Sequence, residues 1–206
     1  MFSCSFLAGQ ETTAEVLLWT LLLVAKHPEV QRRAFEEVVR TIGSREPSID
    51  DRHAMPYVES VLNEVLRFAN PIPLSPHRVL TPVKMSGGYE LPADTLVIGN
   101  LYAVLHDPNV WPDADHFNPE ANFPLGASAE ECERRSSHLI SFGVGRRICI
   151  GESLARHQLF LFLVGLLQHF EIGEHPAHPL PSEQLGTNGV TRAPLPYKLR
   201  FRRRRN

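Results

Sequence analysis

The chain has 206 residues, 43% of them hydrophobic and 21% charged, which is ordinary globular composition. Its formal net charge of −2 excludes a global basic field for binding nucleic acid. Three cysteines, Cys4, Cys132 and Cys149, are too few and too scattered for a disulfide framework, so a reduced, intracellular environment is expected.

Helices dominate the predicted elements of the first third of the chain. Residues 1–26 are apolar almost all round, which indicates a buried helix, although the apolar run is only about half as long as a bilayer span requires. From Pro28 an apolar residue recurs every four positions until Gly43, which is the pattern of a one-sided amphipathic helix. A third helix is expected over about residues 54–69 and ends before Pro71.

The rest of the chain adds short strands and one more helix. Prolines punctuate residues 107–137, which are expected to be mostly irregular. A very apolar helix follows over about residues 152–169. The predicted fold class is therefore mainly α with small β-sheets (α+β), in one domain over residues 1–206. Strands are expected over residues 79–85 and 89–98, on either side of Gly87-Gly88, and near Val190 and over 197–201.

A glycine-punctuated loop with one cysteine, residues 142–151, precedes the last predicted helix. A lone cysteine cannot be one corner of a four-cysteine metal site, but Cys149 can be the single thiolate that binds a haem iron. The amino terminus of the next helix favours a nearby sulfur anion, and Arg147 can meet a haem carboxylate. The local alternative is a turn with a small buried cysteine. Three glycines allow the backbone to bend and to approach a flat macrocycle: Gly143, Gly145 and Gly151.

This loop resembles the haem loop of the cytochrome P450 family, Phe-x-x-Gly-x-Arg-x-Cys-x-Gly. The five fixed positions are filled by Phe142, Gly145, Arg147, Cys149 and Gly151. The resemblance implies that Cys149 is the axial ligand of the iron of haem b, a ligation for which this family is itself the standard example.

A second motif, residues 8–13, places polar side chains inside the first predicted helix. Back-bonding by threonine and the low helix propensity of Gly9 predict a widened turn that faces a cavity, and a threonine-capped helix start is an equally compatible alternative. The stretch looks like the oxygen-activation motif of the same family. The resemblance implies that Ala8 and Gly9 leave room for dioxygen, and that Glu11 and Thr12 are the acid–alcohol pair that delivers protons to it.

Glu64 and Arg67 lie three positions apart on the third predicted helix and share a face. Such spacing usually marks an exposed pair of little energetic value, but the neighbouring apolar face indicates partial burial. The pair resembles the Glu-x-x-Arg motif that braces the core behind the haem loop of the family. A basic residue of the proline-rich stretch commonly joins it there. Here Ala121 and Asn122 occupy that place, which puts the third bracing contact in question.

Further site assignments follow from the resemblance alone. His77 would meet a haem propionate. The substrate cavity would be lined by Ile72, Leu74, Ser75 and Val190. A zinc site formed by His138 with Cys132 or Cys149 lacks the close paired spacing of structural zinc sites.

The motifs occur in the order of the family and cover essentially the whole chain, which corresponds to the carboxy-terminal part of a full-length member. The resemblance implies a haem-thiolate monooxygenase that inserts one oxygen atom from O2 into a small apolar organic substrate. Electrons would come from a flavoprotein reductase or a ferredoxin, with Arg134, Arg135 and Arg146 as candidate contacts. The alternatives are a truncated, inert fragment that binds haem or does not, and an isomerase-type haem-thiolate enzyme, which the intact acid–threonine pair disfavours.

The expected location is the endoplasmic reticulum membrane, because the sequence resembles the animal microsomal branch. Mitochondrion and cytoplasm are the alternatives, and membrane association is expected for the full-length protein only. The arginine run Arg202–Arg205 is expected to be a solvated, frayed tail.

Overall fold

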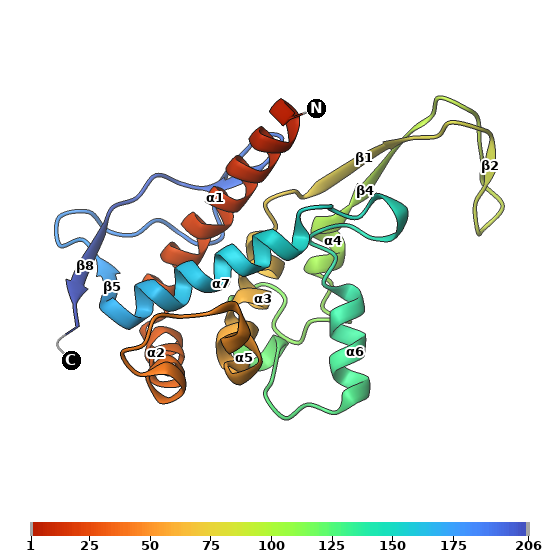
Figure 1. Cartoon of the computed structure of the whole chain (residues 1–206). Helices are drawn as coiled ribbons and strands as arrows, with labels where there is room; N and C mark the ends of the chain where they lie inside the picture. Colours follow the sequence, from red (N-terminus) through yellow and green to blue (C-terminus); the bar gives the residue numbers. More distant parts are fainter. Residues whose placement is uncertain (1, 205–206) are drawn as a thin grey trace.

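The structure is a computed structural model that describes the backbone of residues 2–204 and the side chains of residues 8–204. Four helices pack against one another around the main core (Figure 1). Side chains from all four are almost fully buried there, among them Trp19, Leu22, Val38, Val61 and Phe160. The four helices are α1 (Phe2–Lys26), α2 (Pro28–Ile42), α3 (Pro56–Ala69) and α7 (Glu152–His169).

The predicted helix patterns explain these elements. In α2 the four residues of the apolar repeat, Val30, Ala34, Val38 and Ile42, are all buried, and the helix ends at Gly43 with φ +59°. Residues 54 and 55 are not part of α3, because a 3₁₀-helix, η1 (Ile49–Ala54), precedes it with a capping box at its start.

Eight strands of the described chain form four antiparallel pairs. The first two pairs extend away from the helices (Figure 1). The pairs are β1 (Leu74–Arg78) with β4 (Leu96–Asn100), β2 (Val83–Lys84) with β3 (Glu90–Leu91), β5 (Phe170–Glu174) with β8 (Leu199–Arg203), and β6 (Gly186–Asn188) with β7 (Arg192–Pro194).

The two strands predicted around Gly87-Gly88 are each broken. Only β2 and β3 flank the glycines, and β1 and β4 form a separate pair closer to the helices (Figure 1). Pro82 and Pro92 have no N–H for a ladder, and Asp94 adopts φ +67°, so a continuous hairpin cannot form.

A helix in residues 107–137 corrects the expectation of mostly irregular chain there. This helix is α6 (Ala129–His138), and the short α5 (Pro119–Asn122) precedes it. The remaining helical elements are α4 (Leu101–Leu105) and the 3₁₀-helix η2 (Gly145–Arg147). Ser128 caps α6, with acidic residues in its first turn and basic residues in its last, but Arg135 is its only buried residue. A helix that buries so little shows no apolar period in the sequence.

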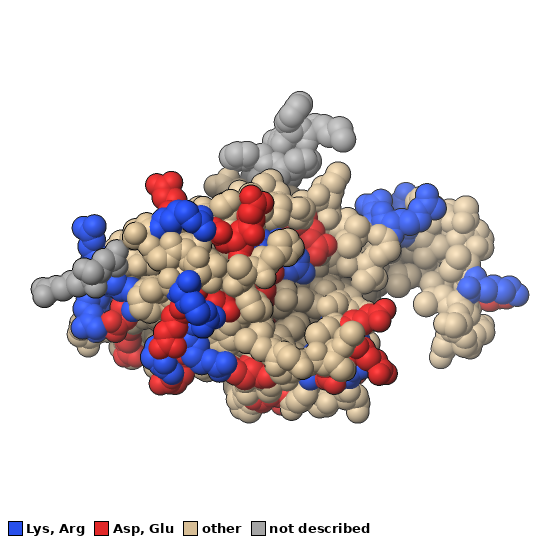
Figure 2. Space-filling view, turned by 60° about the horizontal axis from the view of Figure 1, so that its bottom comes forward, with Lys and Arg blue, Asp and Glu red and all other residues tan. Residues whose placement is uncertain are grey.

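The expectation of a frayed arginine tail is wrong for Arg202, Arg203 and Arg204, which are ordered. Arg202 and Arg203 belong to β8, and Arg202 pairs with Glu171. Arg204 stacks on the ring of Phe35 at 3.7 Å, and Arg205 lies outside the described residues. Acidic and basic side chains are intermixed over the face in Figure 2, in agreement with the small net charge. Among the helices of the described chain, none combines the length and the hydrophobicity of a bilayer span.

Candidate functional site

Cys149 lies in a tight loop directly before α7. Its backbone N–H donates to the carbonyl of Phe142 at 2.9 Å, which closes the loop on itself. Gly143 and Gly145 adopt φ +79° and +70°, so these two positions require glycine. Gly151 has an ordinary φ of −92°, and a Cβ there would meet Cys149 Sγ at 3.9 Å, so its backbone does not require glycine.

The thiol of Cys149 is free and exposed, so the alternative of a small buried cysteine is wrong. Apolar side chains beside it are exposed as well, and Ile150 is fully so. In the part of the chain that the structure describes, no group of three His, Cys, Asp or Glu residues could hold a metal ion. One exposed thiol among apolar side chains suits a flat apolar group whose metal needs a single protein ligand.

Arg156 braces this loop and was not found from the sequence. Its guanidinium lies 5.1 Å from the ring of Phe142, and it donates to Glu152 and to Asn63 of α3, each at 2.9 Å. Asn63 and Arg156 are 93 positions apart, so the sequence could not indicate their contact. The only signal in the sequence was the four-residue spacing of Glu152 and Arg156, which is typical of an ion pair on a helix.

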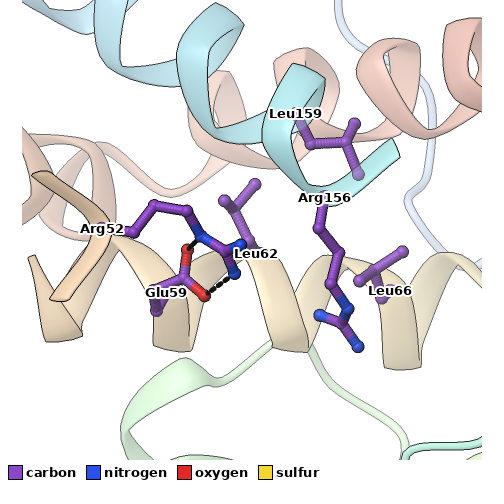
Figure 3. A pocket seen from close by; sticks show the side chains of 6 residues that line it. All are labelled: Arg52, Glu59, Leu62, Leu66, Arg156 and Leu159. Atoms are coloured by element: carbon purple, nitrogen blue, oxygen red, sulfur yellow. Dashed lines mark hydrogen bonds and ion pairs between the residues drawn. The ribbon is translucent and has the colours of Figure 1, made fainter. Parts of the chain in front are cut away.

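The hollow beside Arg156, between η1, α3 and α7, is filled by side chains (Figure 3). Arg52 closes one end of it through two hydrogen bonds to Glu59, of 2.9 and 2.6 Å. The remaining lining residues are Leu62, Leu66 and Leu159. It leaves no space for a water molecule, so it is part of the support behind the loop and not a binding site.

Glu64 and Arg67 form a completely buried, bidentate pair, with contacts of 2.7 and 2.8 Å. The alternative of an exposed pair is therefore wrong. Asn122 supplies the contact that was in question, because its amide donates to Glu64 Oε1 at 3.0 Å, together with the backbone N–H of Asn118 at 2.9 Å. Burial raises the pKa of Glu64, and the hydrogen bonds from Arg67 and the amides oppose that rise. Arg67 also donates to the carbonyls of Leu105, Ala114 and His116.

The polar motif of α1 sits inside an uninterrupted α-helix. Thr12 donates back to the carbonyl of Ala8 at 2.7 Å, so neither the widened turn nor the helix-start alternative is present. A Cβ added to Gly9 would meet nothing within 4 Å. One turn further along, Glu15 is buried, accepts a hydrogen bond from Thr191 at 2.6 Å, and has its pKa raised by burial.

The predicted cavity residues lie on two segments that meet near α1. Leu74 and Ser75 begin β1, where Ser75 and His77 share a hydrogen bond of 3.1 Å. Val190 lies in the turn between β6 and β7 and is 90% exposed. Ile72 is half-buried just before β1. A backbone hydrogen bond of 2.8 Å from Arg192 to Pro71 joins the two segments.

One proposed contact for a redox partner is not available at the surface. Arg135 is buried, pairs with Glu131 at 2.5 Å, and donates to the carbonyls of Ala121 and Asn122. Its role is to hold α6 against α5, while Arg134 and Arg146 are exposed.

Known proteins match the chain along almost its whole length. A model of the cytochrome P450 family matches residues 3–201. Rat cytochrome P450 2B15 is 37% identical over 202 residues, which is 95% of this chain and 39% of the relative. Bovine cytochrome P450 2D14 is 41% identical over 196 residues, which is 94% of this chain and 38% of the relative.

A zebrafish cytochrome P450 structure with abiraterone shows the same architecture, with a TM-score of 0.87 and 34% identity. The alignment covers 99% of this chain and 46% of that structure. The chain thus spans less than half the length of the relatives it matches. The extent of the family match shows that this chain belongs to the cytochrome P450 family.

Proposed function

We propose that the chain forms the haem-ligating and oxygen-activating part of a haem-thiolate monooxygenase, with Cys149 as the axial ligand of haem b. The observation that carries this proposal is the exposed Cys149 thiol in a loop bent by Gly143 and Gly145. Family membership supports a haem cofactor in general. When bound, the haem supplies the activation of dioxygen, from which one oxygen atom passes to an apolar organic substrate.

The loop and its neighbours hold this group. The N–H groups at the start of α7 stabilise the negative charge of the Cys149 thiolate. Arg147 and His77 bind the two carboxylates of the haem by charge-assisted hydrogen bonds. Arg156 keeps Phe142 in place through the ring contact described above, which supports the backbone of the loop around Cys149.

Thr12 and Glu11 of α1 would supply the protons that this chemistry consumes. The hydroxyl proton of Thr12 points to the carbonyl of Ala8, which leaves the lone pairs of its oxygen free to accept a proton donor. Glu11 is exposed one position earlier, so its carboxyl group is in contact with solvent. Ala8 and Gly9 leave open space on this side of α1.

The substrate, the redox partner and the location are inferred from the family. Ile72, Leu74, Ser75 and Val190 would line an apolar cavity. The similar zebrafish structures contain abiraterone and progesterone, which favours an organic ligand of that kind. A flavoprotein reductase or a ferredoxin would supply electrons. The microsomal type of the relatives favours the endoplasmic reticulum membrane.

The ligand assignment is tested by reconstituting the purified chain with haem, reducing it and adding carbon monoxide. A strongly red-shifted Soret band is expected for the chain and for Cys132→Ser, and its loss is expected for Cys149→Ser. Cys132 is the matched control because it is also free and exposed. Haem uptake and a Soret band that survive in Cys149→Ser would refute the assignment.

A binding-only role is the second candidate. It is favoured by apolar side chains left at the surface of α7, where Leu154 is 63% and Phe162 53% exposed. A haem-loaded sample that forms no product from any apolar substrate, with reductase and NADPH present, would support this candidate over the monooxygenase.

A further inference from the structure

Arg192 is a buried arginine without an acidic partner. It is 7% exposed and forms no ion pair with any residue that the structure describes. Its guanidinium donates to three backbone carbonyls, those of Phe68 at 3.3 Å, Ala69 at 2.8 Å and Gln184 at 3.1 Å. It also lies 4.6 Å from the ring centroid of Trp19. Burying a charge in this way is costly, so such an arrangement is retained only where its contacts compensate.

These contacts join three elements. Phe68 and Ala69 are the last residues of α3, where carbonyl groups lack partners within the helix and a cation interacts favourably with the helix dipole. The N–H of Arg192 donates to the carbonyl of Pro71 at 2.8 Å, and its own carbonyl accepts from Trp19 Nε1 at 3.0 Å. One residue of β7 thereby fixes α1, the end of α3 and the segment that leads into β1.

The turn that carries Val190 packs against α1 and against the side chain of Arg192. Thr191, next to Arg192, donates to Glu15 of α1 at 2.6 Å. On the other strand of the hairpin, a Cβ on Gly186 would lie 2.8 Å from the carbonyl of Ala193 and 3.2 Å from Arg192 Cγ. The hairpin therefore packs closely on the stem of Arg192, and a side chain at position 186 would collide with the backbone of the opposite strand.

We propose that Arg192 is a positioning residue that sets the distance between the Val190 turn and residues 70–74. Through that distance it determines which ligands the proposed cavity accepts. The inference rests on the proposed function, in which Val190 and Ile72 line the same cavity from two different segments. Arg192 itself points away from the turn tip, toward the end of α3, and acts through these neighbours and not by touching the ligand.

The chain offers a matched control in Arg204. Its guanidinium also stacks on an aromatic ring, that of Phe35, and donates to two carbonyls at the end of a helix, those of Leu167 at 3.0 Å and Phe170 at 3.1 Å. It makes a further contact of 3.5 Å to Gln31. Replacing Arg204 removes a ring contact and carbonyl hydrogen bonds at the end of α7, the same kinds of contact that Arg192 makes at the end of α3. The elements that Arg204 joins carry none of the proposed cavity residues.

The test compares Arg192→Met with Arg204→Met in the haem-loaded chain, with progesterone as the probe ligand. Arg192→Met is expected to raise the dissociation constant of progesterone by about ten-fold, because one or two of the hydrogen bonds that position the cavity segments are lost. Arg204→Met is expected to raise it by less than about two-fold. The Soret band of the reduced carbon monoxide complex is expected to stay unchanged in both. Arg192→Lys, which keeps the charge and can still reach a carbonyl, is expected to restore part of the affinity.

A second measurement needs neither haem nor ligand. Amide hydrogen exchange of the free chain is expected to speed up in residues 70–74 and 186–194 in Arg192→Met, and to stay unchanged there in Arg204→Met. If the unsubstituted chain binds no haem, the proposed function fails, and if it binds haem but not progesterone, only the choice of probe fails. In either case this exchange pattern still decides whether Arg192 positions the two segments. Equal changes in affinity for both variants, or unaltered exchange in the two segments, would overturn the proposal. Should Arg192→Met fail to fold, Arg192→Lys, which keeps the charge and makes fewer hydrogen bonds, is expected to shift both measurements in the same direction by a smaller amount.

Discussion

The amide of Asn122 occupies the place where the resemblance to the family predicted a basic residue, and it balances the buried Glu64–Arg67 pair without adding a charge. A second cation would leave a net positive charge in the core, whereas an amide donates to Glu64 and leaves the pair neutral. Asn122 also accepts from the N–H of Asp113 at 3.2 Å and donates to its carbonyl at 3.0 Å. The amide thus ties the proline-rich stretch to α3 without adding charge.

Asn122→Ala is expected to lower the free energy of unfolding by about 1–3 kcal/mol, because a buried carboxylate loses one donor. Arg67→Met is expected to cost more, about 3–5 kcal/mol, because it leaves Glu64 buried without its counter-charge. Urea unfolding followed by circular dichroism measures both. Asn109→Ala, on an exposed turn, is the control with no expected change. A fully stable Asn122→Ala variant would mean that the third contact contributes nothing.

The elements that the sequence predicted best are those with a strong local pattern. The helix expected over residues 152–169 coincides with α7, and the four-residue repeat of α2 is buried as expected. Helix α6 escaped prediction because it buries a single residue, and the long strands failed where Pro82 and Pro92 interrupt the ladder.

The same distinction holds for the candidate site. Cys149, Glu64 and Arg67 stand in short motifs, and the resemblance of these motifs to those of the family marked them as candidates. Arg192 and Arg156 act through contacts to residues 123 and 93 positions away, and no local pattern reveals such contacts. Their roles depend on which helix ends the fold brings together.

Helix α4 ends at a histidine that stays neutral at physiological pH. His106 stacks on the ring of Tyr102 at 3.9 Å, and burial, with a further contribution from Arg67, lowers its pKa to about 4. The unfolded chain binds this proton near pH 6.5, whereas the folded chain binds it only near pH 4. The contribution of His106 to the free energy of unfolding is therefore fully present above pH 6.5 and is lost as the pH falls toward 4.

His106→Gln is expected to flatten this part of the acid unfolding profile, with a gain on the order of 1 kcal/mol at pH 5 relative to the unsubstituted chain. Thermal unfolding at a series of pH values between 4 and 7 measures the effect. His53→Gln, on the exposed side of η1, serves as the comparison and should leave the profile as it is. Identical profiles for His106→Gln and the unsubstituted chain would show that His106 is protonated as easily in the fold as outside it.

At the scale of the whole molecule, exposed apolar residues gather around the proposed haem and substrate segments. Ile150 in the loop is fully exposed and Val190 is 90% exposed, while the core under them is closely packed. Contiguous exposed apolar surface marks binding sites and also promotes self-association. The haem-free chain is therefore expected to bind hydrophobic dyes and to associate as its concentration rises.

The variant Ile150→Gln/Val190→Gln tests this expectation without disturbing the core, because neither side chain buries appreciable area. Its free energy of unfolding is expected to change by less than about 0.5 kcal/mol per site, while dye fluorescence and the mean mass in sedimentation equilibrium both fall. Leu163→Gln, at a position only 1% exposed, should do the opposite, because a polar group in the core unfolds the chain and increases dye binding. If self-association persists in the double variant, the associating surface lies elsewhere. The next surface to substitute would then be the protruding segment with the β1–β4 and β2–β3 pairs, where Leu80 is 77% and Tyr89 73% exposed.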